Sequence, residues 1–129
     1  MDAFNIVAEI QARTFSLIQP GMPFKRLLEV EKEMYEHFGI PNEWEAHYQG
    51  GPTGYRIVNP MLGLTDEVIR TGMAFEWFST MPGMKMAELT MLTGRGFEMP
   101  SSQNGDWPKQ RITLPDGFSV EMPGIYVMD

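Results

Sequence analysis

The feature that most constrains the fold is a change of sequence pattern at Trp44. Before it, residues 2–38 carry apolar side chains at helical spacing, whereas after it glycine or proline recurs every few residues. Aromatic and β-branched residues fill the intervals, which is typical of short antiparallel strands. The order of the two patterns predicts an α+β fold, with two N-terminal helices packed on one face of a curved antiparallel sheet.

Two amphipathic helices are expected in the first part. The first covers residues 2–19, with Asp2 at its start and Pro20-Gly21 at its end. Its buried stripe is formed by Val7, Ile10, Thr14 and Leu17. The second begins at Pro23 and ends at Gly39, and its acidic residues, including Glu31, are expected mostly on the solvated side.

The second part is expected to contain a series of strands joined by tight turns. Pro115-Asp116-Gly117 is a turn with a clear cause, because proline presets one φ angle and glycine supplies the other. Thr65 is an expected N-cap for one helical turn over residues 65–70. The expected strands are 73–78, 86–93, 111–114, 118–122 and a final strand over 124–128.

Composition excludes several functions. The chain has 129 residues, of which 43% are hydrophobic, and we expect one domain over residues 1–129. A net charge of −7 argues against a nucleic-acid partner, and the absence of cysteine removes disulfides and cysteine-based zinc sites. No stretch has the ~20 apolar residues of a membrane helix. Without a recognisable secretion signal at the start of this sequence, we expect a cytoplasmic protein with no membrane partner.

The segment Trp44–Arg56 is the candidate binding loop. It combines a histidine and several aromatic residues with glycines and a proline, the residue types needed where the backbone turns sharply or approaches a ligand closely. An ordinary tight connection is the alternative interpretation.

Three segments in order resemble the C-terminal half of the pita-bread metallopeptidases, the family of Xaa-Pro dipeptidase (prolidase), Xaa-Pro aminopeptidase, methionine aminopeptidase and creatinase. Ile18-Gln19-Pro20-Gly21 is similar to the family's link between two helices. His47-Tyr48-Gln49-Gly50-Gly51-Pro52-Thr53-Gly54 resembles its H-x-x-G-H-G-x-G loop, in the form of a divergent branch labelled Xaa-Pro dipeptidase. Gly72-Met73-Ala74-Phe75 followed by Lys85–Thr90 resembles its two following strand motifs. The resemblance implies half of a creatinase-like fold.

The family resemblance also implies a hydrolase with two divalent metals such as manganese, cobalt or zinc, held by two Asp, two Glu and one His. The two Asp ligands would lie upstream of the first helix, outside this sequence. The His ligand matches Gly51 and the first Glu ligand matches Phe78. The second matches Glu88 if the strand is shifted by one residue, and Ala87 if it is not. Glu88 is therefore the one candidate metal ligand, or else an exposed or hydrogen-bonded strand residue.

Substrate contacts are expected at His47, Tyr55 and Arg56. His47 matches the family's outer loop histidine, which lies near substrate, and Arg56 could hold a peptide carboxylate through two hydrogen bonds. The alternatives are a histidine bonded to neighbouring backbone, and a surface arginine beside a core tyrosine.

The sequence therefore predicts a fragment or degenerate relative of an Xaa-Pro dipeptidase, inactive alone and with no cofactor of its own. The alternative is a non-catalytic module on the same fold that binds a small peptide or amino acid. A third hypothesis is an interaction subunit that forms a homodimer or pairs with another half of a longer chain, because half of a two-part fold exposes an apolar face.

Overall fold

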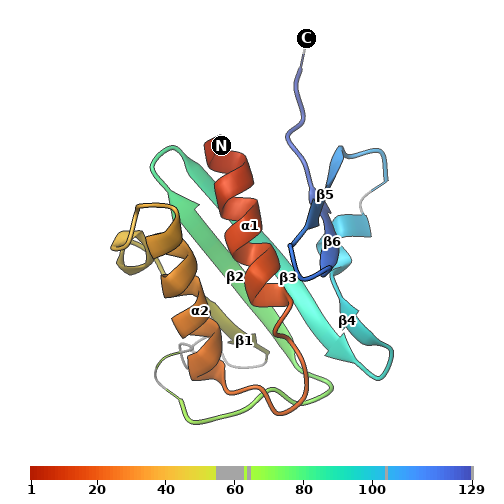
Figure 1. The fold of residues 1–129 in the computed structure, drawn as a ribbon. Coiled ribbons are helices and arrows are strands. Elements are labelled where there is room, and N and C mark those ends of the chain that lie inside the picture. Colours follow the sequence, from red (N-terminus) through yellow and green to blue (C-terminus); the bar gives the residue numbers. More distant parts are fainter. Residues whose placement is uncertain (55–62, 64, 104, 129) are drawn as a thin grey trace.

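The structure is a computed structural model that describes residues 1–54, 63, 65–103 and 105–128. Two helices, α1 (Ala3–Phe15) and α2 (Phe24–His37), are followed by a short 3-10 helix, η1 (Glu43–Glu45). The remaining elements are β1 (Gly50–Thr53), β2 (Ala74–Met81), β3 (Met84–Thr93), β4 (Gly96–Glu98), η3 (Pro100–Gln103), β5 (Lys109–Thr113) and β6 (Ser119–Pro123). The predicted α+β class is confirmed (Figure 1).

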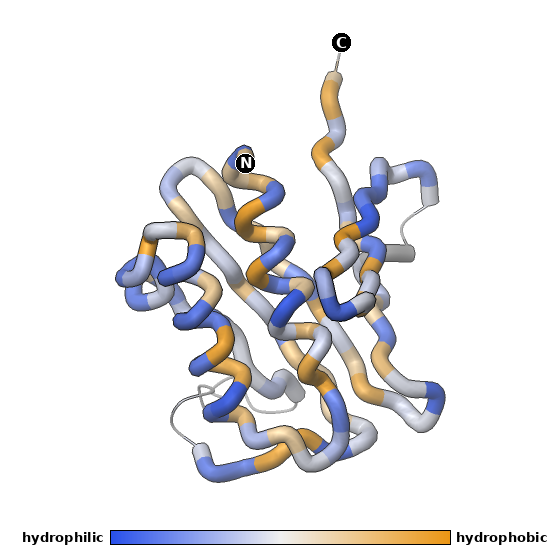
Figure 2. The backbone as a smooth tube through the Cα atoms, in the orientation of Figure 1, coloured by the Kyte–Doolittle hydropathy of each residue, from blue (hydrophilic) through white to orange (hydrophobic). Residues whose placement is uncertain are grey.

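Helix α1 begins where the sequence predicts and ends earlier. Asp2 caps it by accepting a hydrogen bond from the Asn5 N–H at 2.9 Å. After Phe15 the chain tightens, because the N–H of Leu17 bonds the Thr14 carbonyl three residues back at 3.1 Å. Both helices carry a mixture of hydrophilic and hydrophobic residues (Figure 2). No described helix is long and apolar enough to cross a membrane.

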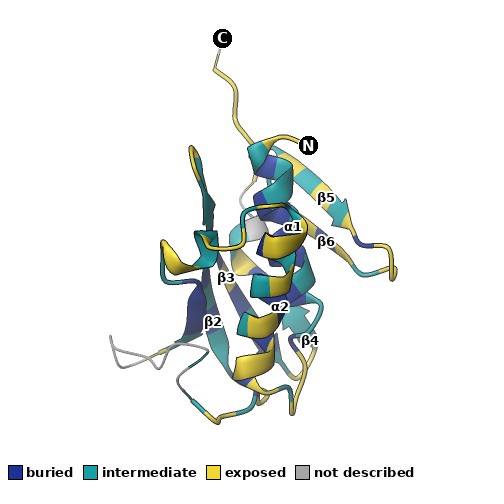
Figure 3. Cartoon of the chain, turned by 60° about the vertical axis from the view of Figure 1, so that its left-hand side comes forward, coloured by how far each residue is buried: buried dark blue, intermediate teal, exposed yellow. Residues whose placement is uncertain are grey.

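The helices lie on one face of a four-stranded antiparallel sheet with the order β1-β2-β3-β4 (Figures 1 and 3). The core between these layers is aromatic. Phe15 of α1 packs against Trp77 of β2 with ring centroids 5.8 Å apart, and Phe24 of α2 meets the Phe75 ring edge-on at 5.7 Å. The buried Trp77 indole N–H donates to Thr90 Oγ1 at 2.8 Å, so its polar atom is satisfied.

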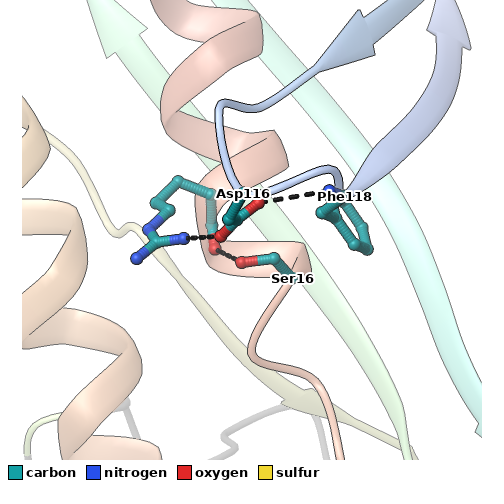
Figure 4. Close-up of polar contacts among 4 residues, drawn as sticks. Ser16, Asp116 and Phe118 are labelled. Carbon is teal, nitrogen blue, oxygen red and sulfur yellow. Dashed lines mark hydrogen bonds and ion pairs between the residues drawn. The ribbon is translucent and has the colours of Figure 1, made fainter.

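The strands form two sheets, where one was predicted. β5 and β6 pair only with each other among the described strands, around the predicted Pro115-Asp116-Gly117 turn. Asp116 fixes this hairpin to α1 (Figure 4). Its carboxylate accepts from the Phe118 N–H at 3.1 Å and from Arg13 at 2.5 Å. This ion pair is exposed, so we attribute positioning to it more than stability.

Residues 65–70 do not form the predicted helical turn. The Thr65 hydroxyl does accept from the Glu67 N–H at 3.1 Å, but the chain then runs extended beside the link between the helices. Ile69 donates to the Met22 carbonyl at 2.9 Å and accepts from Gly21 at 2.8 Å. Tertiary pairing and burial of the Ile69 side chain therefore override the local capping signal.

Two further predictions are wrong. Residues 124–128 are not a strand, because no described strand lies beside them to pair with their backbone. Glu31 does not lie on the solvated face of α2, since its side chain is 0% exposed. It turns toward α1, where Thr14 Oγ1 lies 3.5 Å from its carboxyl oxygen. Burial raises the pKa of Glu31 well above its usual value, against the smaller opposing effect of the Thr14 hydrogen bond.

Candidate functional site

Strand alternation divides the sheet into a helix face and an open face. Phe75, Trp77 and Ser79 of β2 are buried against the helices. The side chains between them, Glu76 and Phe78, therefore belong to the opposite face, which we call the open face. In β3 the same alternation places the exposed residues Lys85, Ala87 and Leu89 on the open face.

The candidate loop is fixed to the rest of the fold through the buried Gln49. The Gln49 side-chain amide donates to the carbonyl oxygens of Trp44 and His47, each at 3.0 Å. Its own oxygen accepts from the Tyr35 hydroxyl of α2 at 3.1 Å. Tyr35 also accepts from the Thr80 N–H at 3.0 Å. A buried hydrogen-bond chain thus fixes the loop to both a helix and a strand.

Gly50 lets β1 approach β2 closely. Its φ angle is 141°, in the region that favours glycine, and an added Cβ would lie 2.5 Å from the Glu76 carbonyl oxygen. The neighbouring Gln49 carbonyl accepts from the Phe78 N–H at 3.0 Å. The expectation that this glycine-rich segment needs a special backbone is therefore confirmed at Gly50.

His47 lies over the open face and is held in one tautomer. Its Nδ1 lies 2.7 Å from the Tyr48 carbonyl oxygen, which can only accept, so Nδ1 carries the proton. Its Nε2 lies 3.1 Å from Lys85 Nζ. Lysine is a donor only, so Nε2 accepts from the ammonium group. The pair therefore presents one positive charge beside a neutral imidazole.

Aromatic rings lie near the Lys85 ammonium group. Phe78 lies 5.7 Å from the His47 ring and 5.9 Å from the Tyr48 ring, and Lys85 Nζ lies 5.0 Å from the Phe78 centroid. Burial, and secondly the nearby Glu76 carboxylate, raise the pKa of Tyr48. The open face thus carries a cation at Lys85 and an anion at Glu76, with aromatic surface near both.

A cavity of about 410 Å³ adjoins the loop. Residues 44–50 form most of its wall, and Leu28 of α2 contributes from the other side. This volume is within the range of small-molecule sites. Trp44 in this wall is covered by Lys32, whose Nζ lies 3.8 Å from the ring centroid.

The predicted site residues are not all brought together. His47 is in the cluster just described, while Tyr55 and Arg56 lie outside the described residues. Glu88 lies on the helix face, 8% exposed, and accepts a hydrogen bond from Ser101. Burial raises the pKa of Glu88, and the Ser101 hydrogen bond opposes that shift. A metal role for Glu88 stays a prediction that this geometry does not favour.

Lys85 is the site residue that the sequence analysis missed. The family resemblance includes Lys85 in a strand motif but implies no role for it. The alternation of side chains along a strand indicates that Lys85 and Ala87 lie on the same face. Ala87 matches a family ligand position if the strand is not shifted, so Lys85 could have been placed near the site from the sequence. The contact between Lys85 and His47 could not be predicted from the sequence, because the two residues are 38 positions apart in the chain.

Comparison with solved structures identifies the fold. The prolidase of Pyrococcus furiosus matches 75% of this chain with a TM-score of 0.62 and 23% sequence identity. The chain has the fold of part of a prolidase. The Xaa-Pro dipeptidase of Bacillus anthracis matches 75% with a TM-score of 0.61 and 25% identity, and the X-Pro aminopeptidase of Thermotoga maritima matches 73% with 0.58 and 22%. No protein-family model and no curated protein matches.

The chain spans less than a third of each of these solved proteins: 31% of the Pyrococcus prolidase, 29% of the Bacillus dipeptidase and 28% of the Thermotoga aminopeptidase. The structural likeness establishes the prolidase fold over the matched part.

The donor set of the described residues does not fit a two-metal centre. The positions that match the family's ligands do lie close together, because Phe78 pairs directly with Ala87 and Gly51 pairs with Glu76, two residues before Phe78. Glycine, phenylalanine and alanine side chains cannot ligate a cation. Among the described residues, no three His, Asp or Glu side chains are grouped as a metal site.

Proposed function

We propose that this chain is a fragment or relative of a prolidase that binds a small carboxylate-bearing ligand, a peptide or amino acid, on its open face without hydrolysing it. The observation that carries the proposal is the Lys85–His47 pair at 3.1 Å, beside Phe78 at a position where the family resemblance implies a metal ligand. In place of bound cations, this face presents the chain's own ammonium group.

The chemistry of the site supports a carboxylate. Lys85 has hydrogen-bond donors left after it bonds His47, and a carboxylate oxygen is the natural acceptor for them. The aromatic rings of Phe78 and Tyr48 offer apolar surface for a side chain such as a proline ring. Glu76 on the same face supplies an acceptor for an α-amino group. These groups together match a short zwitterionic peptide.

The same residues support the proposal that the ligand is not hydrolysed. The described part of the chain supplies no cluster of acidic or imidazole ligands with which to activate a water molecule at this face. His47 could act as a base only after the hydrogen bond that its Nε2 accepts from Lys85 is broken. We therefore assign His47 to binding and leave it no catalytic role.

Isothermal titration calorimetry tests the proposal. We expect dipeptides with a free carboxylate to bind and their amides to bind at least about tenfold more weakly, because loss of a charge-assisted hydrogen bond costs about 1.5–3 kcal/mol. Lys85→Met should remove the preference for the free acid. The control is Lys109→Met, which alters an exposed lysine on β5. Equal affinity for acid and amide in the wild-type chain would contradict the assignment.

A second candidate is a pairing module, favoured by one observation. Leu89 on the open face is 38% exposed, so the face offers apolar area to a second copy or to another part of a longer chain. Leu89→Asp should abolish such pairing and leave the chain folded, as judged by circular dichroism and light scattering.

A further inference from the structure

Strand β3 has an edge that is paired only at one end. It pairs with β2 over Met84–Met91, but with β4 only at Met91–Thr93. Phe78 directs its N–H toward Gln49, away from β3, so its partner Ala87 is in a non-hydrogen-bonded pair of the β2–β3 ladder. The backbone polar groups of Ala87 therefore point away from β2. By alternation those of Lys85 do the same, and no described strand lies opposite either residue.

A groove runs along this free edge. Its volume is about 430 Å³, and Met84–Glu88 form one wall. Trp107 and residues 123–125 form the opposite wall, with Phe4 of α1 also in contact. An edge with unpaired N–H and C=O groups is a template for another extended chain.

The segment after β6 has the properties of such a chain. Ile125, Tyr126, Val127 and Met128 are 60%, 56%, 77% and 84% exposed, and the segment projects away from the rest of the molecule (Figure 1). Three of the four are residue types enriched in strands. Four consecutive exposed apolar residues are unfavourable in water and indicate a surface that is covered by another chain.

The start of this segment is held firmly at the rim of the groove. Gly124 donates its N–H to the Pro108 carbonyl at 2.6 Å and accepts from the Trp107 indole at 3.0 Å. The rings of Trp107 and Tyr126 pack with centroids 5.5 Å apart. Because residues 123–125 are themselves a wall of the groove, and the segment leaves in the outward direction, it does not fold back into its own groove.

We propose that two copies of this chain exchange these segments, residues 125–128 of each adding as a strand to the Lys85–Ala87 edge of the other. The donor segment begins at the rim of the groove that accepts the partner's segment. A two-fold axis beside this rim therefore lets each chain place its segment in the groove of the other. The exchange pairs the free backbone groups of β3 and buries the four apolar side chains. It uses the backbone edge of β3, and is independent of ligand binding on the open face.

Cross-linking between two single-cysteine variants tests this directly, since the natural sequence has no cysteine. Chains carrying Ala87→Cys are mixed with chains carrying Val127→Cys and treated with a short bis-maleimide reagent. We expect a cross-linked pair containing one chain of each kind. Mixing Ala87→Cys with Thr113→Cys, an exposed position on β5, is the matched control. Cross-linking no greater than in this control would overturn the proposal.

Light scattering of the wild-type and charged variants gives a second readout. The wild-type chain should have the mass of a dimer, Val127→Asp should have that of a monomer, and Leu89→Asp should remain a dimer. A monomeric wild-type chain would overturn the proposal. So would a dimer that Leu89→Asp abolishes and Val127→Asp leaves intact, because pairing would then occur through the open face.

Discussion

Tyr35 connects helix α2 to the residues that carry His47. Its hydroxyl donates to Gln49, which in turn bonds the His47 carbonyl, and it accepts the N–H of Thr80 in β2. Burial raises the pKa of Tyr35 to about 12, so it keeps its proton and its role as a donor at neutral pH. The Tyr35 side chain thus links α2 and β2 to the loop that carries His47.

Tyr35→Phe should lower the free energy of unfolding by about 1–3 kcal/mol, because it leaves the Thr80 N–H and the Gln49 oxygen without a partner. It should also weaken ligand binding, since Gln49 then positions His47 less firmly. Urea denaturation and calorimetry measure the two effects. The control is Lys109→Met, at an exposed position on β5, where we expect a change within about 0.5 kcal/mol. Equal effects of the two substitutions would contradict this role.

Glu31 should make stability depend on pH. Its pKa is raised in the folded state, so the folded chain retains a proton that the unfolded chain loses above the ordinary value of 4.5. The contribution is fully present below that pH and is lost as pH rises toward the folded pKa, at about 1.4 kcal/mol per pH unit. Glu31→Gln should flatten the decline in stability that begins as pH rises above about 4.5. Parallel profiles for the two proteins in urea denaturation would show that Glu31 is not the cause.

At the level of elements, the position of β1 depends on one glycine. Gly50 takes a φ of 141° and brings its backbone against Glu76 and Trp77 of β2. Because β1 follows the candidate loop directly, a displaced β1 would also displace His47. The pairing of β1 with β2 is therefore part of the site and not only of the scaffold.

Gly50→Ala should destabilise the chain by at least about 1–3 kcal/mol, from backbone strain and from the clash with the Glu76 carbonyl. Gly54→Ala is the matched control, because an added Cβ there meets nothing within 4 Å and its φ is not in the glycine region. Thermal unfolding compares the two. A smaller loss for Gly50→Ala than for Gly54→Ala would contradict the close approach.

The sequence predicted those elements whose signals are local. Both helices, the β2–β3 pair and the turn at Asp116 follow from periodicity and turn residues, and all are present. The errors have a common cause in tertiary contacts. Residues 65–70 pair with the link between the helices, and Glu31 faces α1 because a helix packed on two sides buries more than one stripe. The Lys85–His47 contact depends on strand register, which the sequence pattern did not determine.

At the level of the whole molecule, the chain combines part of a prolidase fold with a different set of side chains on its open face. The family resemblance implies metal ligands at Gly51, at Phe78 and at either Ala87 or Glu88, and the fold places these positions on three neighbouring strands. Lys85 supplies positive charge at the same face. We therefore expect a carboxylate-bearing ligand to bind the Lys85 ammonium group with no need for a metal.

The most direct test follows the His47 ring resonances by NMR while a dipeptide is added, first with EDTA and then with excess zinc. We predict saturable shifts of the same size and midpoint in both conditions, an unchanged dipeptide at the end of each titration, and no shifts in Lys85→Met. Shifts that require zinc, or cleavage of the dipeptide when zinc is supplied, would contradict the account and restore the metallopeptidase interpretation for this chain.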